Sequence, residues 1–148
     1  QSCLLKESAL EAIYIAADHA GFSLKEWLKG QFDSWNWHDL GTNSTERVDY
    51  PDFAEKLAEQ IRQNPERKGI LICGSGQGMA IKANRDPSVR AALCWSPEVA
   101  QLAREHNDAN VLCLSSRQVD DELNKEIVLT FFQTSFLGGR HQGRVNKL

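Results

Sequence analysis

The sequence predicts an α/β protein, a three-layer α/β/α sandwich built around a Rossmann-like five-stranded parallel sheet. Five short apolar, β-prone runs alternate along the chain with segments whose apolar residues recur at helical spacing. Polar residues follow directly after the first and the third of these runs. In a parallel sheet those positions share the carboxyl edge, where ligands bind, and right-handed crossovers connect the strands.

The predicted strands are short apolar runs bounded by polar or turn-forming residues. The first reads AIYIAA, and the third ends abruptly at a cysteine before a glycine-rich turn. The strands are expected at residues 12–17, 35–40, 69–73, 89–94 and 110–114.

The predicted helices carry apolar residues three and four positions apart. Leu24 and Leu28 belong to such a stripe in the first helix, and Pro51 opens the second, since proline is favoured in a first turn. Residues 41–50 are polar and turn-rich and are expected to form a loop. The helices are expected at residues 22–32, 51–63, 79–84, 97–105 and 119–134.

Composition limits the classes of function. The chain has 148 residues, 41% of them hydrophobic, and a formal net charge of −3. It is long enough for one packed core, and its acidic balance argues against binding to nucleic acid or to a membrane surface. No apolar run reaches the length of about 18 residues that predicts a membrane span. We expect a single domain over residues 12–148, preceded by an extension at residues 1–11 without signal-peptide features.

Four cysteines, Cys3, Cys73, Cys94 and Cys113, are present, and no two of them form a CxxC pair. Three lie in or at the end of apolar, strand-like runs. This pattern favours reduced thiols in a cytoplasmic protein over a disulfide framework or a zinc site.

The strand-end thiol Cys73 begins the most informative stretch. Gly74, Gly76 and Gly78 follow at alternate positions, with Ser75 between the first two, and helix-compatible residues come next. Unpaired amide groups in such a strand–turn–helix suit a phosphate or an oxyanion formed in a reaction, and their field favours a thiolate. The spacing matches neither the GxGxxG of dinucleotide folds nor a P-loop. The alternative is a buried cysteine packed beside a glycine-rich turn.

Histidine and aspartate side chains near strand ends are further candidates. Asp18 and His19 follow the first strand, where they either face a ligand or cap the next helix. His106 lies between a predicted helix and the last strand, where a histidine is most often a helix-end residue. Together with Cys73 these side chains resemble a metal-ligand set, but catalytic or structural roles explain them more simply.

The C-terminal segment, residues 136–148, is basic and has no acidic residue. Arg140 and Arg144 are spaced to share one face of a helix, and paired guanidinium groups bind phosphate well. The alternative is a solvated basic tail. Arg117, which follows the last strand, is a weaker candidate of the same kind.

Five motifs in order carry a resemblance to a known family. They are DHAGF at 18–22, RVDYPDFA at 47–54, ICGSGQGMAIKANR at 72–85, REHNDANVL at 104–112 and GGRHQGRV at 138–145. Together they resemble the sugar-phosphate isomerases that comprise type B ribose-5-phosphate isomerases and the galactose- and allose-6-phosphate isomerases. The resemblance spans residues 13–145.

The resemblance implies an aldose–ketose isomerase that works through a cis-enediolate without metal or organic cofactor. It implies that Cys73 is the base, that Ser75 assists the thiolate, and that amides of residues 74–78 stabilise the enediolate oxygen. His106 would open the furanose ring, and Asp18 would relocate a hydroxyl proton.

The resemblance also implies a substrate-binding set and a homodimer or homotetramer whose active sites are shared between subunits. The basic tail of one subunit would then serve its neighbour. The implied substrate-binding residues are His19, Asp49, Tyr50, Gly74, Gly76, Gly78, Asn107, Arg117, Arg140 and Arg144.

Two departures from the family pattern bear on the prediction: Ser75 stands where the family usually has threonine, and residues 1–11 are not part of the pattern. Some family members use a glutamate as base a few residues past the first glycine; residues 77–79 here hold no carboxylate, which favours the cysteine variant of the chemistry. The expected substrates are ribose 5-phosphate and ribulose 5-phosphate. Alternatives are a six-carbon sugar phosphate, selected by the loop 41–50, a non-catalytic sugar-phosphate binding protein, and a thiol redox sensor.

Overall fold

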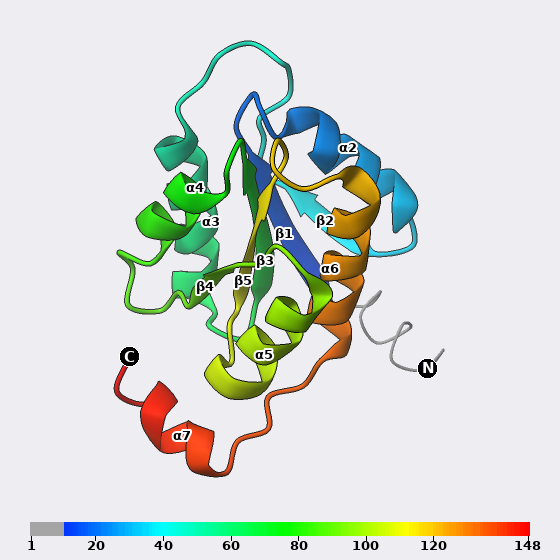
Figure 1. Ribbon diagram of the computed structural model, residues 1–148. Coiled ribbons are helices and arrows are strands. Elements are labelled where there is room, and N and C mark those ends of the chain that lie inside the picture. The colour runs from blue at the N-terminus through cyan, green and yellow to red at the C-terminus, as the bar shows by residue number, and fades with distance from the viewer. Residues whose placement is uncertain (1–10) are drawn as a thin grey trace.

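A computed structural model describes residues 11–148 and contains one five-stranded parallel sheet with the strand order β2-β1-β3-β5-β4 (Figure 1). The expected N-terminal extension and Cys3 lie outside the described residues. The strands are β1 (Ala12–Ala17), β2 (Asn36–Asp39), β3 (Lys68–Cys73), β4 (Ala91–Leu93) and β5 (Val111–Ser115). The predicted five-stranded parallel α/β fold is confirmed.

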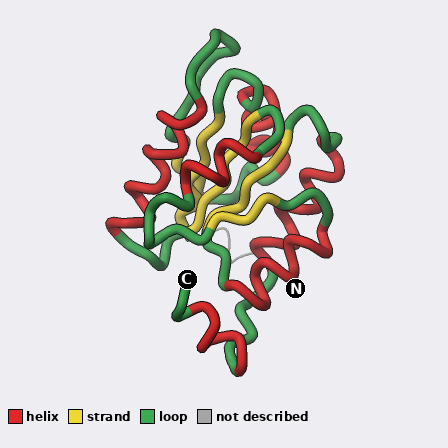
Figure 2. The backbone as a smooth tube through the Cα atoms, turned by 60° about the vertical axis from the view of Figure 1, so that its left-hand side comes forward, coloured by secondary structure: helices red, strands yellow, loops and turns green. Residues whose placement is uncertain are grey.

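Helices cover both faces of the sheet, as Figures 1 and 2 show. On one face pack α2 (Phe22–Gln31), α5 (Pro97–Asn107) and α6 (Asp121–Gln133); on the other pack α3 (Tyr50–Gln63) and α4 (Gln77–Ala83). Residues of β1 alternate between the two cores. Ile13 and Ile15 join the first core and Tyr14 joins the second, which is the period-2 pattern of a doubly covered strand.

The predicted element boundaries hold to within two residues, and two of the differences are informative. The fourth strand is confined to Ala91–Leu93 instead of 89–94, and α5 continues to Asn107 instead of ending at 105. The helix ends because Asp108 adopts a left-handed conformation at φ 47° and donates its N–H to the carbonyl of Arg104. His106 is therefore in the last turn of α5.

The basic C-terminal segment forms a short helix, α7 (Arg140–Val145), which carries Arg140 and Arg144. This helix does not cover the sheet. It lies against the end of α5, where Leu137 N–H donates to the carbonyl of Glu105 at 3.1 Å. α7 is thus at the opposite end of the sheet from the loops that follow β1 and β3 (Figure 1).

A buried lysine joins α2 to β2, a contact that helical periodicity does not predict. Lys25 is fully buried, and its ammonium lies 2.6 Å from Asp39 and 2.8 Å from Glu26. Lys29 reaches the same Asp39 oxygen at 2.7 Å, and Gly41 N–H donates to the other oxygen at 2.8 Å. Asp39 therefore links two lysines of α2 to the start of the loop at residues 41–49.

Substitution of Asp39 tests this link. Burial raises the pKa of Asp39, but its bonds to Lys25, Lys29 and the Gly41 amide lower that pKa by more. Asp39→Ala should reduce the free energy of unfolding at pH 7 by about 2–3 kcal/mol, because a buried cation loses its closest partner. Since a depressed carboxyl pKa stabilises the fold only while the group is ionised, the wild type should lose this advantage below about pH 4.

Urea unfolding of wild type and variant at pH 7 and in acid is the measurement. The half-exposed Glu26, changed to alanine, is the control and should cost less. Equal unfolding midpoints for wild type and Asp39→Ala at pH 7 would contradict the assignment.

Candidate active site

Cys73 is the last residue of β3 and is 5% exposed at the carboxyl edge of the sheet. Its Sγ accepts a hydrogen bond from Gly76 N–H at 3.2 Å, so the turn folds back over the thiol. The carbonyl of Cys73 accepts from Ser116 N–H at 3.0 Å, and that of Gly74 accepts from Ser115 Oγ at 2.7 Å. Because the C=O and N–H of a trans peptide point in opposite directions, the following amides face away from β5.

Two of the turn glycines are required by the geometry. Gly76 has φ 78°, and a Cβ there would lie 2.9 Å from the carbonyl oxygen of Leu114. A Cβ on Gly78 would overlap the ring of Tyr50, which packs directly on this glycine. The alternating glycines therefore serve close packing as well as backbone conformation.

A cleft of about 560 Å³ opens beside this turn and is lined by residues 47–49, which end the loop that follows β2, and by the first turn of α3. The sequence-predicted residues Asp18, His19, Asp49, Tyr50 and Arg117 all line it. The structure therefore brings together residues from two separate motifs and Arg117, beside the glycine turn of a third motif, at one edge of the sheet.

Asp18 and His19 are held by backbone groups. Asp18 Oδ1 accepts from the amides of Ala20 and Gly21 at 3.0 and 3.1 Å, so the carboxylate orders the turn into α2 as well as lining the cleft. His19 Nδ1 lies 3.2 Å from both the amide nitrogen and the carbonyl oxygen of Val48. Either tautomer tethers Nδ1 to Val48 and leaves Nε2 for a ligand.

Arg117 connects the cleft to the glycine turn. Its main-chain N–H donates to the carbonyl of Gly74 at 3.0 Å, and its side chain packs over the same glycine, where an added Cβ would lie 3.0 Å from Nη1. A guanidinium in this position is suited to an anion held between the turn and the cleft.

The remaining predicted site residues form a second set at the opposite end of the sheet. His106 and Asn107 end α5, and Arg140 and Arg144 lie on α7. Because α5 runs antiparallel to the strands, its last turn is at their amino edge, about one strand length, roughly 15 Å, from the carboxyl edge. One chain therefore does not bring the two sets together.

Sequence reasoning missed several residues of these two sets. Arg47 and Val48 line the cleft, and Ser115 and Ser116 hold the glycine turn. His141 stacks on His106, with ring centroids 4.3 Å apart and planes 15° from parallel. Arg47, Val48 and His141 lie within the quoted motifs and the two serines lie outside them, and in each case only the tertiary fold shows which groups the residue contacts.

The described cysteines differ in environment. Burial raises the pKa of Cys94 to about 12 and that of Cys113 well above its ordinary value, so both are protonated at neutral pH. Cys73, Cys94 and Cys113 are all free thiols. Within residues 11–148, no group of three or more histidine, cysteine or acidic side chains is arranged to hold a metal ion, and no helix is long and apolar enough to cross a membrane.

Fold and site define an α/β protein with a thiol and an anion-suited cleft at the carboxyl edge of its sheet. A family described as Ribose/Galactose Isomerase matches residues 13–148, and the chain belongs to this family of isomerases.

Individual relatives agree over nearly the whole chain. The chain is 46% identical over 140 residues to a probable ribose-5-phosphate isomerase B of Mycoplasma genitalium, covering 92% of each protein. It is 41% identical to ribose-5-phosphate isomerase B of Escherichia coli, covering 94% of this chain and 95% of that one.

Solved structures give the same result. The crystal structure of a ribose 5-phosphate isomerase from Thermotoga maritima matches with a TM-score of 0.90 and 48% identity, covering 93% of this chain and 97% of that one. Ribose-5-phosphate isomerase B of Mycoplasma genitalium, crystallised with bound ribulose-5-phosphate, matches with a TM-score of 0.89 and 45% identity, covering 93% of each.

The stacked histidine pair makes a testable prediction. Burial, the adjacent His106 and the charges of Arg140 and Arg144 lower the pKa of His141, against the opposing effect of Glu105. An NMR titration of the folded protein should place the His141 midpoint below the ordinary histidine value of about 6.5. Because the unfolded chain then binds the proton more readily, acidification below that value should weaken the docking of α7.

His141→Gln assigns the signal by removing it. A midpoint at or above the ordinary histidine value would contradict this account of the pair.

Proposed function

We propose that this protein interconverts D-ribose 5-phosphate and D-ribulose 5-phosphate, with Cys73 as the base. The observation that carries the proposal is the strand-end thiol, whose Sγ accepts the Gly76 amide beside a cleft lined by Asp18, His19 and Arg117. Membership of the isomerase family and the relative that binds ribulose-5-phosphate support the substrate.

The central step is a proton transfer between two carbons. The Cys73 thiolate takes the proton from C2 of the open-chain aldose, and the electrons of that C–H bond form a C1–C2 double bond. The former carbonyl oxygen becomes the negatively charged oxygen of a cis-enediolate. Asp18 carries a proton from the C2 hydroxyl to this oxygen, a carbonyl forms at C2, and Cys73 returns its proton to C1.

The glycine turn would stabilise the charged intermediate. Its amides face away from β5, because the carbonyls of Cys73 and Gly74 are held by the end of that strand. Amides fixed in this way stabilise a developing oxyanion without reorganising. Ser75 Oγ accepts from Gln77 N–H at 3.2 Å, and its hydroxyl hydrogen would donate to the thiolate or to the substrate.

Ring opening and phosphate binding would use residues of a second copy of the chain. His106 would transfer protons between the anomeric hydroxyl and the ring oxygen, and Asn107 would contact the substrate beside it. Arg140 and Arg144 would bind the phosphate with His19 and Arg117, and Asp49 and Tyr50 would line the sugar. The separation of the two sets within one chain supports a homodimer, alone or within a homotetramer, with two shared sites.

The chemistry fits an enzyme that needs no metal or organic cofactor. Electrons move only within the substrate, and every proton has a protein group to carry it. We infer that residues 12–148 form a single sugar-phosphate isomerase domain and that the protein works in the cytoplasm on a free sugar phosphate. The loop at residues 41–49 borders the cleft and would select five-carbon over six-carbon substrates.

Removal of the thiol is the first test. Cys73→Ala should lower turnover of ribose 5-phosphate by roughly 10²–10⁴-fold, the range for losing a general base, while phosphate affinity stays unchanged. Isomerase assays with ribose 5-phosphate and allose 6-phosphate, for wild type and variant, are the measurement.

Each outcome assigns the site differently. Unchanged turnover in Cys73→Ala would remove the thiol from the mechanism. Turnover of allose 6-phosphate alone would show that the substrate is a six-carbon sugar phosphate. Binding of both sugar phosphates without turnover would favour a sugar-phosphate binding protein.

Subunit mixing tests the shared site. Cys73→Ala and His106→Gln should each be inactive, but a heterodimer of the two has one site with both native groups. Random mixing should therefore restore about one quarter of wild-type activity. Cys73→Ala mixed with Asp18→Asn is the matched control; both changes belong to the same half, so no heterodimer site is intact. A mixture that stays inactive after verified subunit exchange would show that His106 acts within its own chain or not at all.

A further inference from the structure

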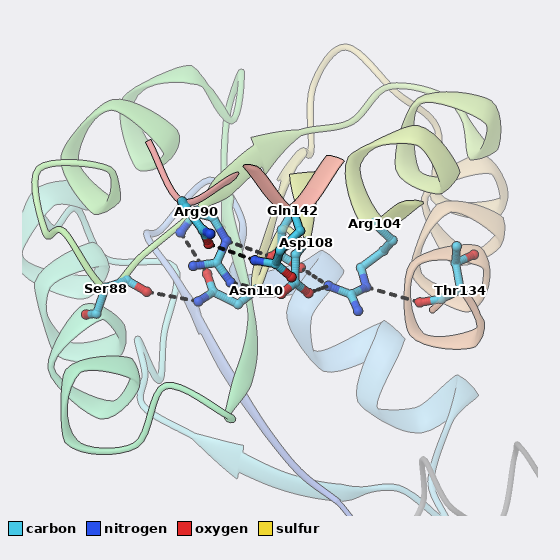
Figure 3. A network of polar contacts seen from close by, with 9 residues as sticks. Ser88, Arg90, Arg104, Asp108, Asn110, Thr134 and Gln142 are labelled. Atoms are coloured by element: carbon cyan, nitrogen blue, oxygen red, sulfur yellow. Dashed lines mark hydrogen bonds and ion pairs between the residues drawn. The ribbon is translucent and has the colours of Figure 1, made fainter. Parts of the chain in front are cut away.

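Arg104 of α5 is a buried cation that the proposed mechanism does not use. Its side chain is 6% exposed, and its guanidinium reaches two separate segments of the chain (Figure 3). Nη1 donates to the Asp108 carboxylate at 2.9 Å and to the carbonyl of Ala109 at 2.6 Å, in the corner between α5 and β5. Nε donates to the carbonyl of Thr134, the first residue after α6, at 3.1 Å.

The corner that Arg104 holds directly follows the two site residues that end α5. Asp108 is left-handed there and is also held from its other side by Arg90, whose Nε donates to the Asp108 carbonyl at 2.8 Å. Asn110 adds bonds to Arg90 N–H and to the carbonyl of Ser88 at 2.8 and 2.9 Å (Figure 3). The main chain after Asn107 is therefore fixed by side-chain bonds on both sides.

Three successive residues of α5 contact α7 and the segment that leads to it. Arg104 binds the carbonyl of Thr134, the Glu105 carbonyl accepts from Leu137 N–H at 3.1 Å, and the His106 ring stacks on that of His141. Of these three contacts, the Arg104 bond comes first along the chain, at Thr134, where the segment leaves α6.

We propose that Arg104 is a positioning residue that holds the ring-opening end of α5 and the arginine-bearing α7 as one rigid unit. This inference rests on the proposed function, because it assigns both parts to one half of a shared site. A guanidinium suits the role because its fixed fork bridges acceptors on separate segments, whereas the single ammonium of lysine cannot reach them all. Because the guanidinium is buried, losing any one of its acceptors leaves part of a desolvated cation unpaired, so partly broken arrangements are disfavoured.

The test compares Arg104→Lys with Arg90→Lys. Both residues bind Asp108, but the Arg90 guanidinium donates to the carbonyl and the carboxylate of Asp108, within the corner after α5, whereas Arg104 also binds the segment after α6. In Arg104→Lys, hydrogen exchange at the Leu137 amide should be at least about tenfold faster, and inorganic phosphate should bind about tenfold more weakly to the assembled protein. Arg90→Lys should leave both values near those of the wild type.

Asp108→Asn is the milder companion if Arg104→Lys folds poorly. Asparagine tolerates the left-handed conformation and still accepts a hydrogen bond, but it lacks the charge that faces Arg104. Asp108→Asn should also speed hydrogen exchange at the Leu137 amide and weaken phosphate binding, but by less than Arg104→Lys does. Because exchange at Leu137 does not depend on any reaction, this measurement stands even if the protein proves not to be an isomerase.

Two results would overturn the proposal. One is a folded Arg104→Lys variant in which hydrogen exchange at the Leu137 amide and phosphate affinity equal those of the wild type. The other is an equal loss in Arg90→Lys, which would show that Arg104 only stabilises the corner.

Discussion

The parallel pairing of β3 with β1 and β5 is the constraint on which the rest of the structure depends. The register sets Ala17 beside Ile72 and Cys73 beside Ser115, so all three strands end at nearly the same level. This register alone places Asp18, the glycine turn and Arg117 at the same edge of the sheet. The same pairing requires each connecting helix to run back, and α5 therefore carries its last turn to the opposite edge.

The sequence predicted most of this architecture, because the periodicity of apolar residues reports which side chains are buried. Alternate side chains of β1 belong to the two cores on opposite faces of the sheet, and the apolar stripes of the helices face the sheet. The apolar periodicity did not predict the side-chain hydrogen bonds and ion pairs that fix where an element ends or that bury a charged residue. The end of α5 depends on the left-handed Asp108 and on Arg104 beneath it, and neither has a periodic signature. From the sequence Lys25 is expected to face solvent, and only the tertiary fold shows that it is buried beside Asp39.

The candidate site was predictable in composition but not in arrangement. Asp18, His19 and the turn after Cys73 follow from the rule that ligands bind at the carboxyl edge. The position of α7 did not follow from any such rule, because its few apolar residues give no stripe to dock. It is placed by a backbone bond to Glu105 and by the histidine pair, which form only once α5 and α6 are packed together.

The opposite-end placement of the two sets has a consequence for how such a protein behaves on dilution. If each site is assembled from the carboxyl edge of one chain and the far end of another, an isolated chain has no complete site. Catalytic capacity would then follow the concentration of paired chains, which falls as the square of the free-chain concentration once pairing is weak. An enzyme of this design responds to its own abundance, with no effector other than a second copy of itself.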